Sequence, residues 1–241
     1  ILPVSVAIAR DSTMDAMLML TQLVSVAVLQ AAVSKQSWRL LLLWAFIVGL
    51  GFNIKYIQVF LVLPASVLYI FLCWKEPFWV ITKKLSMACI LMTLVSLSWV
   101  TIVTLTPDDA RPRVMNDPDN SLIGLIIKYN GLNRVLHQDV VVFQPSSDTD
   151  GQQYTAGASR FGVGNVGLPR LFGGSNGPLL ATVVLLAICG ILFLIFRERE
   201  VLRGPPVLWL AWGATGLTVF LLGNRSPAHY FESVSPAIAV L

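Results

Sequence analysis

The chain has 241 residues, of which 56% are hydrophobic and only 12% are charged, and its mean hydropathy is +0.74. A soluble domain usually carries about twice that share of charged residues, so an ordinary soluble domain is excluded. The net charge is +4, but the basic residues do not form a patch interleaved with aromatic residues. This distribution argues against nucleic acid as a partner.

Apolar residues gather into six spans, and a seventh begins near Tyr230. The predicted spans are Ala16–Val33, Trp38–Ile54, Ile57–Trp74, Leu85–Leu105, Pro178–Phe196 and Val207–Leu222. One crossing of a bilayer takes about 20 residues. The second and third spans are short and meet at Asn53, Lys55 and Gln58, a pattern typical of helices that line a cavity. The sequence therefore predicts an all-α polytopic membrane protein with about six to seven transmembrane helices.

Both ends of the sequence indicate a piece of a longer protein. It opens at Ile1 without an initiator Met or a signal peptide, and it ends at Leu241 inside an apolar run. We therefore expect an internal fragment with three parts. Residues 1–105 form transmembrane helices with an outer-face polar site, residues 106–177 form an extracytoplasmic loop, and residues 178–241 form further, truncated transmembrane helices.

Basic residues beside the spans predict the orientation. The connections 34–38, 75–84 and 197–206, with their flanks, hold eight of them: Lys35, Arg39, Lys75, Lys83, Lys84, Arg197, Arg199 and Arg203. The opposite short segments hold only Arg10, Lys55 and Arg225. The positive-inside rule makes the richer side cytoplasmic. Asp11, Asp15 and the Asn53–Gln58 junction then share the outer side, so we expect a site that faces outside.

The long segment 106–177 holds ten of the seventeen glycines and many Asp, Asn, Ser and Pro residues. Within it, Ser121–Val135 is predicted as a short helix that begins at Asn120 or Ser121 and lies at the membrane surface. Gly162–Gly167 matches the letters of a dinucleotide-binding fingerprint but lacks the strand and helix that this motif needs. We interpret it as flexible backbone. The three cysteines, His137 and His229 have no metal-ligand spacing.

Two segments carry the candidate site residues. Asp11 and Asp15 are four residues apart and would share one face of a helix that extends back through Arg10. Such charges can be merely interfacial, but Asp15 directly heads an apolar span, and an ionisable residue there is a functional hypothesis by default. The second segment places Lys55, with Asn53 and Gln58 nearby, in a turn between two short helices. A lysine in that position can contact a phosphate as a point charge or extend to the interface.

Five motifs, in order, are similar to those of a known family. They are Ala9-Arg10 followed by Asp15, Gly49-Leu50-Gly51-Phe52-Asn53-Ile54-Lys55, Leu97-Ser98-Trp99, Leu105-Thr106-Pro107 with Arg111-Pro112, and Tyr129-Asn130-Gly131-Leu132. Pro236-Ala237-Ile238-Ala239 is a weaker, late match. The order and spacing resemble bacterial members of glycosyltransferase family 39, relatives of the protein O-mannosyltransferases and of the lipid A aminoarabinose transferase. The resemblance is dense from about residue 5 to residue 135.

The resemblance implies an all-helical C-type membrane glycosyltransferase (GT-C) fold. It also implies an enzyme of the bacterial cytoplasmic (inner) membrane whose partners are the bilayer, a polyprenyl-phosphate sugar donor and an acceptor outside the cytoplasm. Asp15 matches the family's second outer acidic position, and Arg10 and Lys55 match its basic positions. The acidic residue of the first outer loop would precede Ile1.

These matches lead to a mechanistic hypothesis. A sugar on a lipid phosphate already has a good leaving group, so the enzyme must deprotonate the acceptor hydroxyl and stabilise the charge on the departing phosphate. We assign Arg10 and Lys55 to the phosphate. Asp15, with Asp11 beside it, orients these groups, holds a divalent metal ion or assists the base. A transporter of a lipid-linked sugar and a non-catalytic assembly subunit stay open as alternatives.

Overall fold

The computed structural model describes residues 14–107, 109–111, 120–127, 141–142, 154–155, 188, 204–222 and 235–240. Its helices are α2 (Asp15–Ser34), α3 (Trp38–Lys55), the 3-10 helix η1 (Tyr56–Val62), α4 (Leu63–Cys73), α5 (Phe78–Leu105), the short α6 (Leu122–Gly124), α10 (Pro205–Leu222) and α11 (Ser235–Val240). Two short strands, β1 (Val141–Val142) and β2 (Tyr154–Thr155), pair antiparallel in the long loop. The predicted all-α membrane architecture is confirmed, with this small pairing as an addition.

The helix boundaries follow local signals at most ends. The side chain of Ser37 accepts a hydrogen bond from the backbone N–H of Leu40 (3.5 Å) and so caps α3, as expected for a serine before a helix. Helix α5 begins at Phe78, seven residues before the predicted start at Leu85. That predicted boundary is wrong because it treats two lysines, Lys83 and Lys84, as part of the connection. Lysine is a good helix former whose long side chain can extend from a helix to water.

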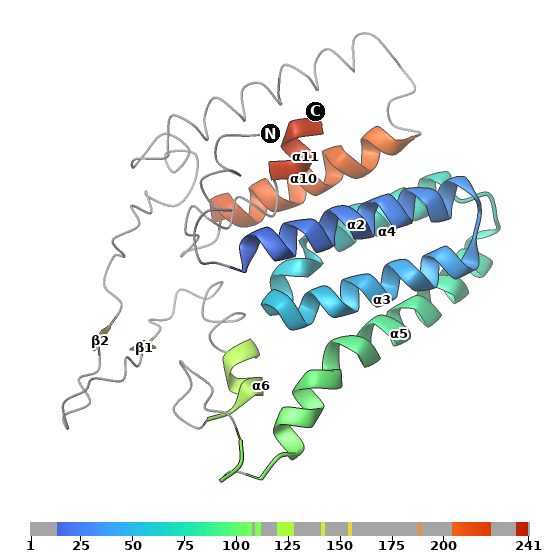
Figure 1. The fold of residues 1–241 in the computed structure, drawn as a ribbon. Helices are drawn as coiled ribbons and strands as arrows, with labels where there is room; N and C mark the ends of the chain where they lie inside the picture. Colours follow the sequence, from blue (N-terminus) through green and yellow to red (C-terminus); the bar gives the residue numbers. More distant parts are fainter. Residues whose placement is uncertain are drawn as a thin grey trace.

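Three helical stretches of the described residues are long and apolar enough to cross a membrane: Asp15–Ser34, Trp38–Cys73 and Phe78–Leu105. The second stretch has 36 residues and folds back on itself (Figure 1). Beyond its two ends, the backbone N–H of Lys75 donates a hydrogen bond to Oε1 of Gln36 (2.8 Å), so these ends lie together. The reversal occurs at Tyr56, whose φ of 49° is rare for a residue with a side chain. The predicted division into two spans at the Asn53–Gln58 junction is therefore confirmed.

Helix α3 packs between α2 and α5, while α4 packs against α10 (Figure 1). Two glycines of α3 allow close approach. A Cβ at Gly49 would lie 2.8 Å from Cβ of Val95 in α5, and a Cβ at Gly51 would lie 2.6 Å from Cγ2 of Val59 in η1 and 3.1 Å from Cγ2 of Thr21 in α2. Small residues at such contacts are typical of membrane helices, whose association depends on close packing.

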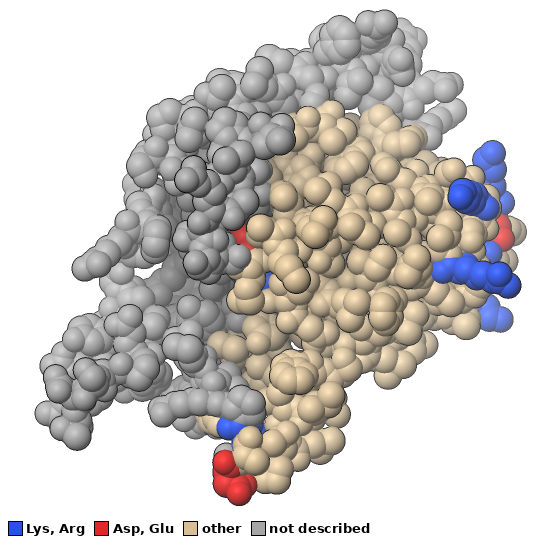
Figure 2. All heavy atoms as spheres, viewed as in Figure 1, with Lys and Arg blue, Asp and Glu red and all other residues tan. Residues whose placement is uncertain are grey.

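The turns that join α2 to α3 and α4 to α5 form one end of the bundle, here named the basic end. It carries five basic residues: Lys35, Arg39, Lys75, Lys83 and Lys84. Figure 2 shows most Lys and Arg side chains of the described residues gathered there. The structure thus confirms that the connections 34–38 and 75–84 lie on the same side of the bundle. The orientation predicted from the basic residues requires this arrangement.

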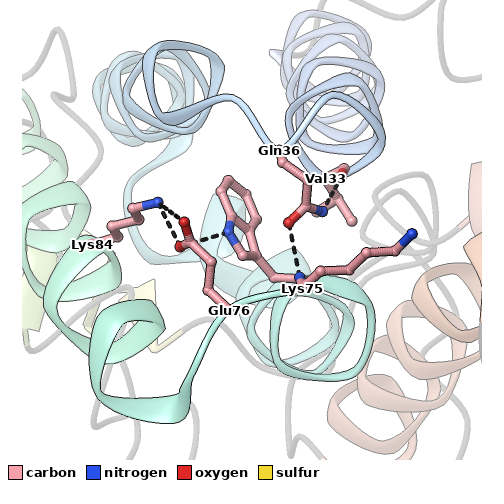
Figure 3. A network of polar contacts seen from close by, with 6 residues as sticks. Val33, Gln36, Lys75, Glu76 and Lys84 are labelled. Carbon is pink, nitrogen blue, oxygen red and sulfur yellow. Dashed lines mark hydrogen bonds and ion pairs between the residues drawn. The ribbon is translucent and has the colours of Figure 1, made fainter.

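A polar network ties the two turns of the basic end together (Figure 3). Oε1 of Gln36 accepts from Lys75, while Glu76 accepts from Lys84 (2.5 and 2.7 Å) and from Nε1 of Trp74 (3.0 Å). The hydrogen bond from Lys84 is the main cause that lowers the pKa of Glu76 below its usual value. The Glu76 carboxylate is therefore charged at neutral pH, and it compensates one of the lysines.

The start of the long loop is held against the end of α5. The Arg111 guanidinium donates hydrogen bonds to the backbone carbonyls of Thr104 (3.0 Å) and Thr106 (2.9 and 3.2 Å), which would otherwise lack helical partners. Ser121 accepts a hydrogen bond from the N–H of Gly124 (3.1 Å) and caps α6, as predicted. A π turn continues α6 through residue 127, and the rest of the predicted helix, like most of the span Pro178–Phe196, lies outside the described residues.

Adding a methyl group at either close-packed glycine is expected to destabilise the bundle. Gly49→Ala and Gly51→Ala should each cost about 1–3 kcal/mol, because the atoms that the new Cβ meets belong to packed helices and cannot move away freely. The apparent midpoint of thermal unfolding of the purified full protein in detergent measures the loss. Gly204→Ala is the matched control, since its Cβ would lie 3.7 Å from Cδ of Pro206. Equal midpoints for all three variants would contradict the packing argument.

Candidate functional site

The candidate site lies at the end of the bundle opposite the basic end, where α2 begins and α3 ends (Figure 1). Asp15, the first residue of α2, forms an ion pair with Lys55, the last residue of α3, in which Lys55 Nζ donates to Asp15 Oδ1. The side chain of Asp15 is 2% exposed and that of Lys55 is 15% exposed. Forty residues separate the two in the sequence, so the reversal of the chain brings them together.

Each charge of the pair stands at the helix terminus that favours it. The N-terminus of α2 carries a partial positive charge that stabilises Asp15, and the C-terminus of α3 carries a partial negative charge that stabilises Lys55. These terminal charges offset part of the desolvation cost of burying two ions. Oδ2 of Asp15 is also buried and has no hydrogen-bond partner among the described residues. It can therefore accept a hydrogen bond from a group that enters the site.

Gln22 is a neighbouring polar residue that sequence reasoning missed. It lies seven residues after Asp15, on the same face of α2, and is fully buried. Its Nε2 lies 3.5 Å from the backbone oxygens of both Gln58 and Val59 in η1. One sequence signal could have identified it, namely an amide inside an apolar span at two helical turns from an acidic residue.

The end of α3 presents different residues to its two neighbours. Nδ2 of Asn53 donates hydrogen bonds to the backbone oxygens of Gly49 (3.3 Å) and of Val95 in α5 (3.2 Å). Lys55 is two residues further on, about 200° around the helix, and faces α2. The amide donors of Asn53 thus serve helix packing here. Its proposed contact with a phosphate stays a prediction and would require these donors to be released.

The structure therefore brings together Asp15 and Lys55, but it turns Asn53 toward α5. Gln58 lies half-buried in η1, three residues after Lys55, and its backbone oxygen is engaged by Gln22. Arg10 and Asp11, with His137 and His229, lie outside the described residues. The roles assigned to the six site residues stay predictions.

A metal ion would need ligands beyond those that the structure describes. Within the described ranges, no three or more His, Cys, Asp or Glu side chains gather where they could hold a metal ion. Asp15 offers one carboxylate, and Lys55 already occupies one of its oxygens. Asp15 and its described neighbours therefore do not fit a metal site by themselves.

The fold and the site define a polytopic α-helical membrane protein with a buried ion pair at one end of its helices. Residues 1–102, which include both partners of the ion pair, match the family model described as Dolichyl-phosphate-mannose-protein mannosyltransferase. This match confirms the resemblance to the GT-C membrane glycosyltransferases that the sequence motifs indicate.

Two proteins of Bacillus subtilis (strain 168) are similar to the chain over 137 residues. The one named "Putative mannosyltransferase YycA" is 36% identical over 56% of this chain and 20% of its own length. The one named "Putative mannosyltransferase YkcB" is 34% identical over 57% of this chain and 19% of its own length. The similarity therefore covers about a fifth of each relative. No solved structure matches the chain significantly.

Removing one partner of the ion pair is expected to destabilise the protein more than removing both. Lys55→Met leaves the carboxylate of Asp15, which is 2% exposed, without this cation, and breaking a buried pair in this way costs about 3–5 kcal/mol. Asp15→Asn should cost less, because Lys55 keeps 15% exposure. The double variant leaves no such charge and should unfold at a higher temperature than either single variant. Thermal unfolding of the purified full protein in detergent tests this, and losses that simply add would contradict it.

Proposed function

We propose that the protein containing this chain transfers a glycosyl group from a polyprenyl-phosphate-linked sugar to an acceptor on the extracytoplasmic side of the membrane. The buried Asp15–Lys55 pair carries the proposal, because it lies within the segment that matches the mannosyltransferase family. The description of that family names a dolichyl-phosphate-mannose donor, which belongs to the same chemical class of lipid-phosphate sugar. The relatives named as mannosyltransferases support the same chemistry.

In the proposed reaction, the acceptor oxygen forms a bond to the anomeric carbon of the sugar while the bond from that carbon to the phosphate oxygen breaks. The acceptor proton passes to a carboxylate base, and the electron pair stays on the phosphate. Lys55 and Arg10 stabilise the departing phosphate. Asp15 orients Lys55 through Oδ1, and its buried Oδ2 is available to a group that arrives with the substrate. Asp11 assists on the same side.

The sidedness is part of the proposal and depends on charge. Five Lys and Arg residues cluster at the basic end, and the ion pair lies at the opposite end of the same helices. The positive-inside rule then places the basic end in the cytoplasm and the site outside. We accordingly propose a bacterial inner-membrane protein. Residues 1–105 hold the site, residues 106–177 form the extracytoplasmic loop, and residues 178–241 return to the membrane.

A transporter of a lipid-linked sugar or another anionic lipid is the second candidate. The break between α3 and η1 favours it, because discontinuous membrane helices often form the binding sites of transporters. Such a protein would move the donor across the membrane without forming a covalent product. The family match favours the transferase over the transporter.

The proposal predicts that transfer depends on both partners of the ion pair. Membranes that contain the full protein are supplied with radiolabelled polyprenyl-phosphate sugars, and label moved onto any acceptor is measured at matched protein levels. Lys55→Met should lower turnover at least about a hundred-fold, because a donor aimed at the developing charge is lost. Asp15→Asn should also lower it strongly, since the lysine then loses its orientation.

Lys84→Met is the matched control, since Lys84 is also ion-paired, to Glu76 (2.5 Å), but at the basic end. It should transfer label like the wild type. Near-normal turnover in Lys55→Met would rule out its phosphate role. Passage of labelled donor across the membrane without a covalent product would replace the transferase with the transporter.

A further inference from the structure

Gln22 makes a contact that its own helix does not require. Its side chain is 0% exposed inside the apolar helix α2, where an amide without partners costs free energy. Nε2 lies 3.5 Å from the backbone oxygens of Gln58 and Val59, and Oε1 has no hydrogen-bond partner among the described residues. The chemistry of the neighbours supports this orientation of the amide, because a carbonyl oxygen turned toward two backbone oxygens would be repelled.

The two backbone oxygens belong to a helical segment whose own hydrogen bonds are weak, so a further donor stabilises them. They lie in η1, and 3-10 helices form hydrogen bonds of poorer geometry than α-helices. Val59 is fully buried, so water does not supply that donor. Close packing reinforces the contact, since a Cβ at Gly51 would lie 2.6 Å from Cγ2 of Val59 and 3.1 Å from Cγ2 of Thr21, the residue before Gln22. Helices α2, α3 and η1 therefore meet directly beside Gln22.

Helix α2 thus holds the segment 55–59 at two points on one face. Asp15 binds Lys55, and Gln22, about 10 Å further along the helix axis, binds the oxygens of Gln58 and Val59. Between the two points lies Tyr56, whose positive φ persists only where the surroundings impose it. Loss of the second attachment would let the end of α3 relax and move the Lys55 ammonium.

We propose that Gln22 is a positioning residue that fixes Lys55 for the phosphate of the lipid-linked donor. The proposal rests on the proposed function, in which Lys55 contacts that phosphate. Gln22 itself touches the η1 backbone and acts on the substrate through Lys55. Its removal should therefore weaken recognition of the phosphate and leave recognition of the lipid chain unchanged.

The test measures binding of polyprenyl monophosphate to the full protein purified in detergent, with the uncharged polyprenol as the comparison ligand. Gln22→Met keeps an unbranched side chain of similar size but removes the donor. It should weaken binding of the phosphate roughly ten-fold and leave binding of the polyprenol unchanged. Ser25→Ala is the matched control, because Ser25 is equally buried on α2 but donates within its own helix, to the backbone oxygen of Gln22 (2.8 Å).

A double variant distinguishes positioning from a general structural role. If Gln22 acts through Lys55, Gln22→Met combined with Lys55→Met binds the phosphate no more weakly than Lys55→Met alone. Additive losses, or equal losses for phosphate and polyprenol, would overturn the proposal.

If Gln22→Met does not fold, Gln22→Leu is tested in the same way, and the KM for the donor in membranes is a second readout. Unchanged binding in Gln22→Met alone overturns only this inference, whereas unchanged binding in Lys55→Met overturns the phosphate role as well.

Discussion

The break between α3 and η1 is the constraint on which the site depends, because buried backbone groups beside a helix break must find partners inside the protein. Aromatic packing helps to hold the break: the ring of Phe52 stacks on Phe60 (centroids 5.5 Å apart) and meets Tyr56 edge-on (5.8 Å). Gln22 supplies a donor to the carbonyls that follow. With the reversal fixed in this way, Lys55 ends beside the first turn of α2.

The heptapeptide Gly49–Lys55 serves two interfaces at once. Gly49 and Asn53 are four residues apart and both contact α5, one by close packing and the other by a hydrogen bond to Val95. Gly51 and Lys55 are also four residues apart, and both contact α2. In each pair the glycine permits close approach of the neighbouring helix, and the polar residue one turn later makes a specific contact with it. The order of residues in this motif thus follows from the helical period.

Within the described residues, the sequence predicts the first three spans to within one residue at each end, because an apolar run of about 20 residues is a direct consequence of bilayer thickness. It also places Asp15 and Lys55 on one side, since alternating spans and basic connections determine the side of each turn. It does not predict their contact, or that Asn53 faces α5, because the rotation of each helix about its axis is set by packing against neighbours. Gln22 escapes notice for a related reason, since its partners are backbone oxygens 36 and 37 residues away.

The ion pair also determines what the proposed reaction demands from other residues. Asp15 compensates the charge of Lys55, so the resting pair has no net formal charge and attracts a distant anion only weakly. A lipid phosphate joined to a sugar is a diester with one negative charge, and it gains a second as the sugar leaves. A lysine held in place by a carboxylate then interacts more strongly with the departing phosphate than with the bound donor. Such a difference lowers the barrier, whereas equal binding of both states would not. The initial attraction of the donor must therefore come from another cation, and Arg10, whose guanidinium is always charged, is the predicted one.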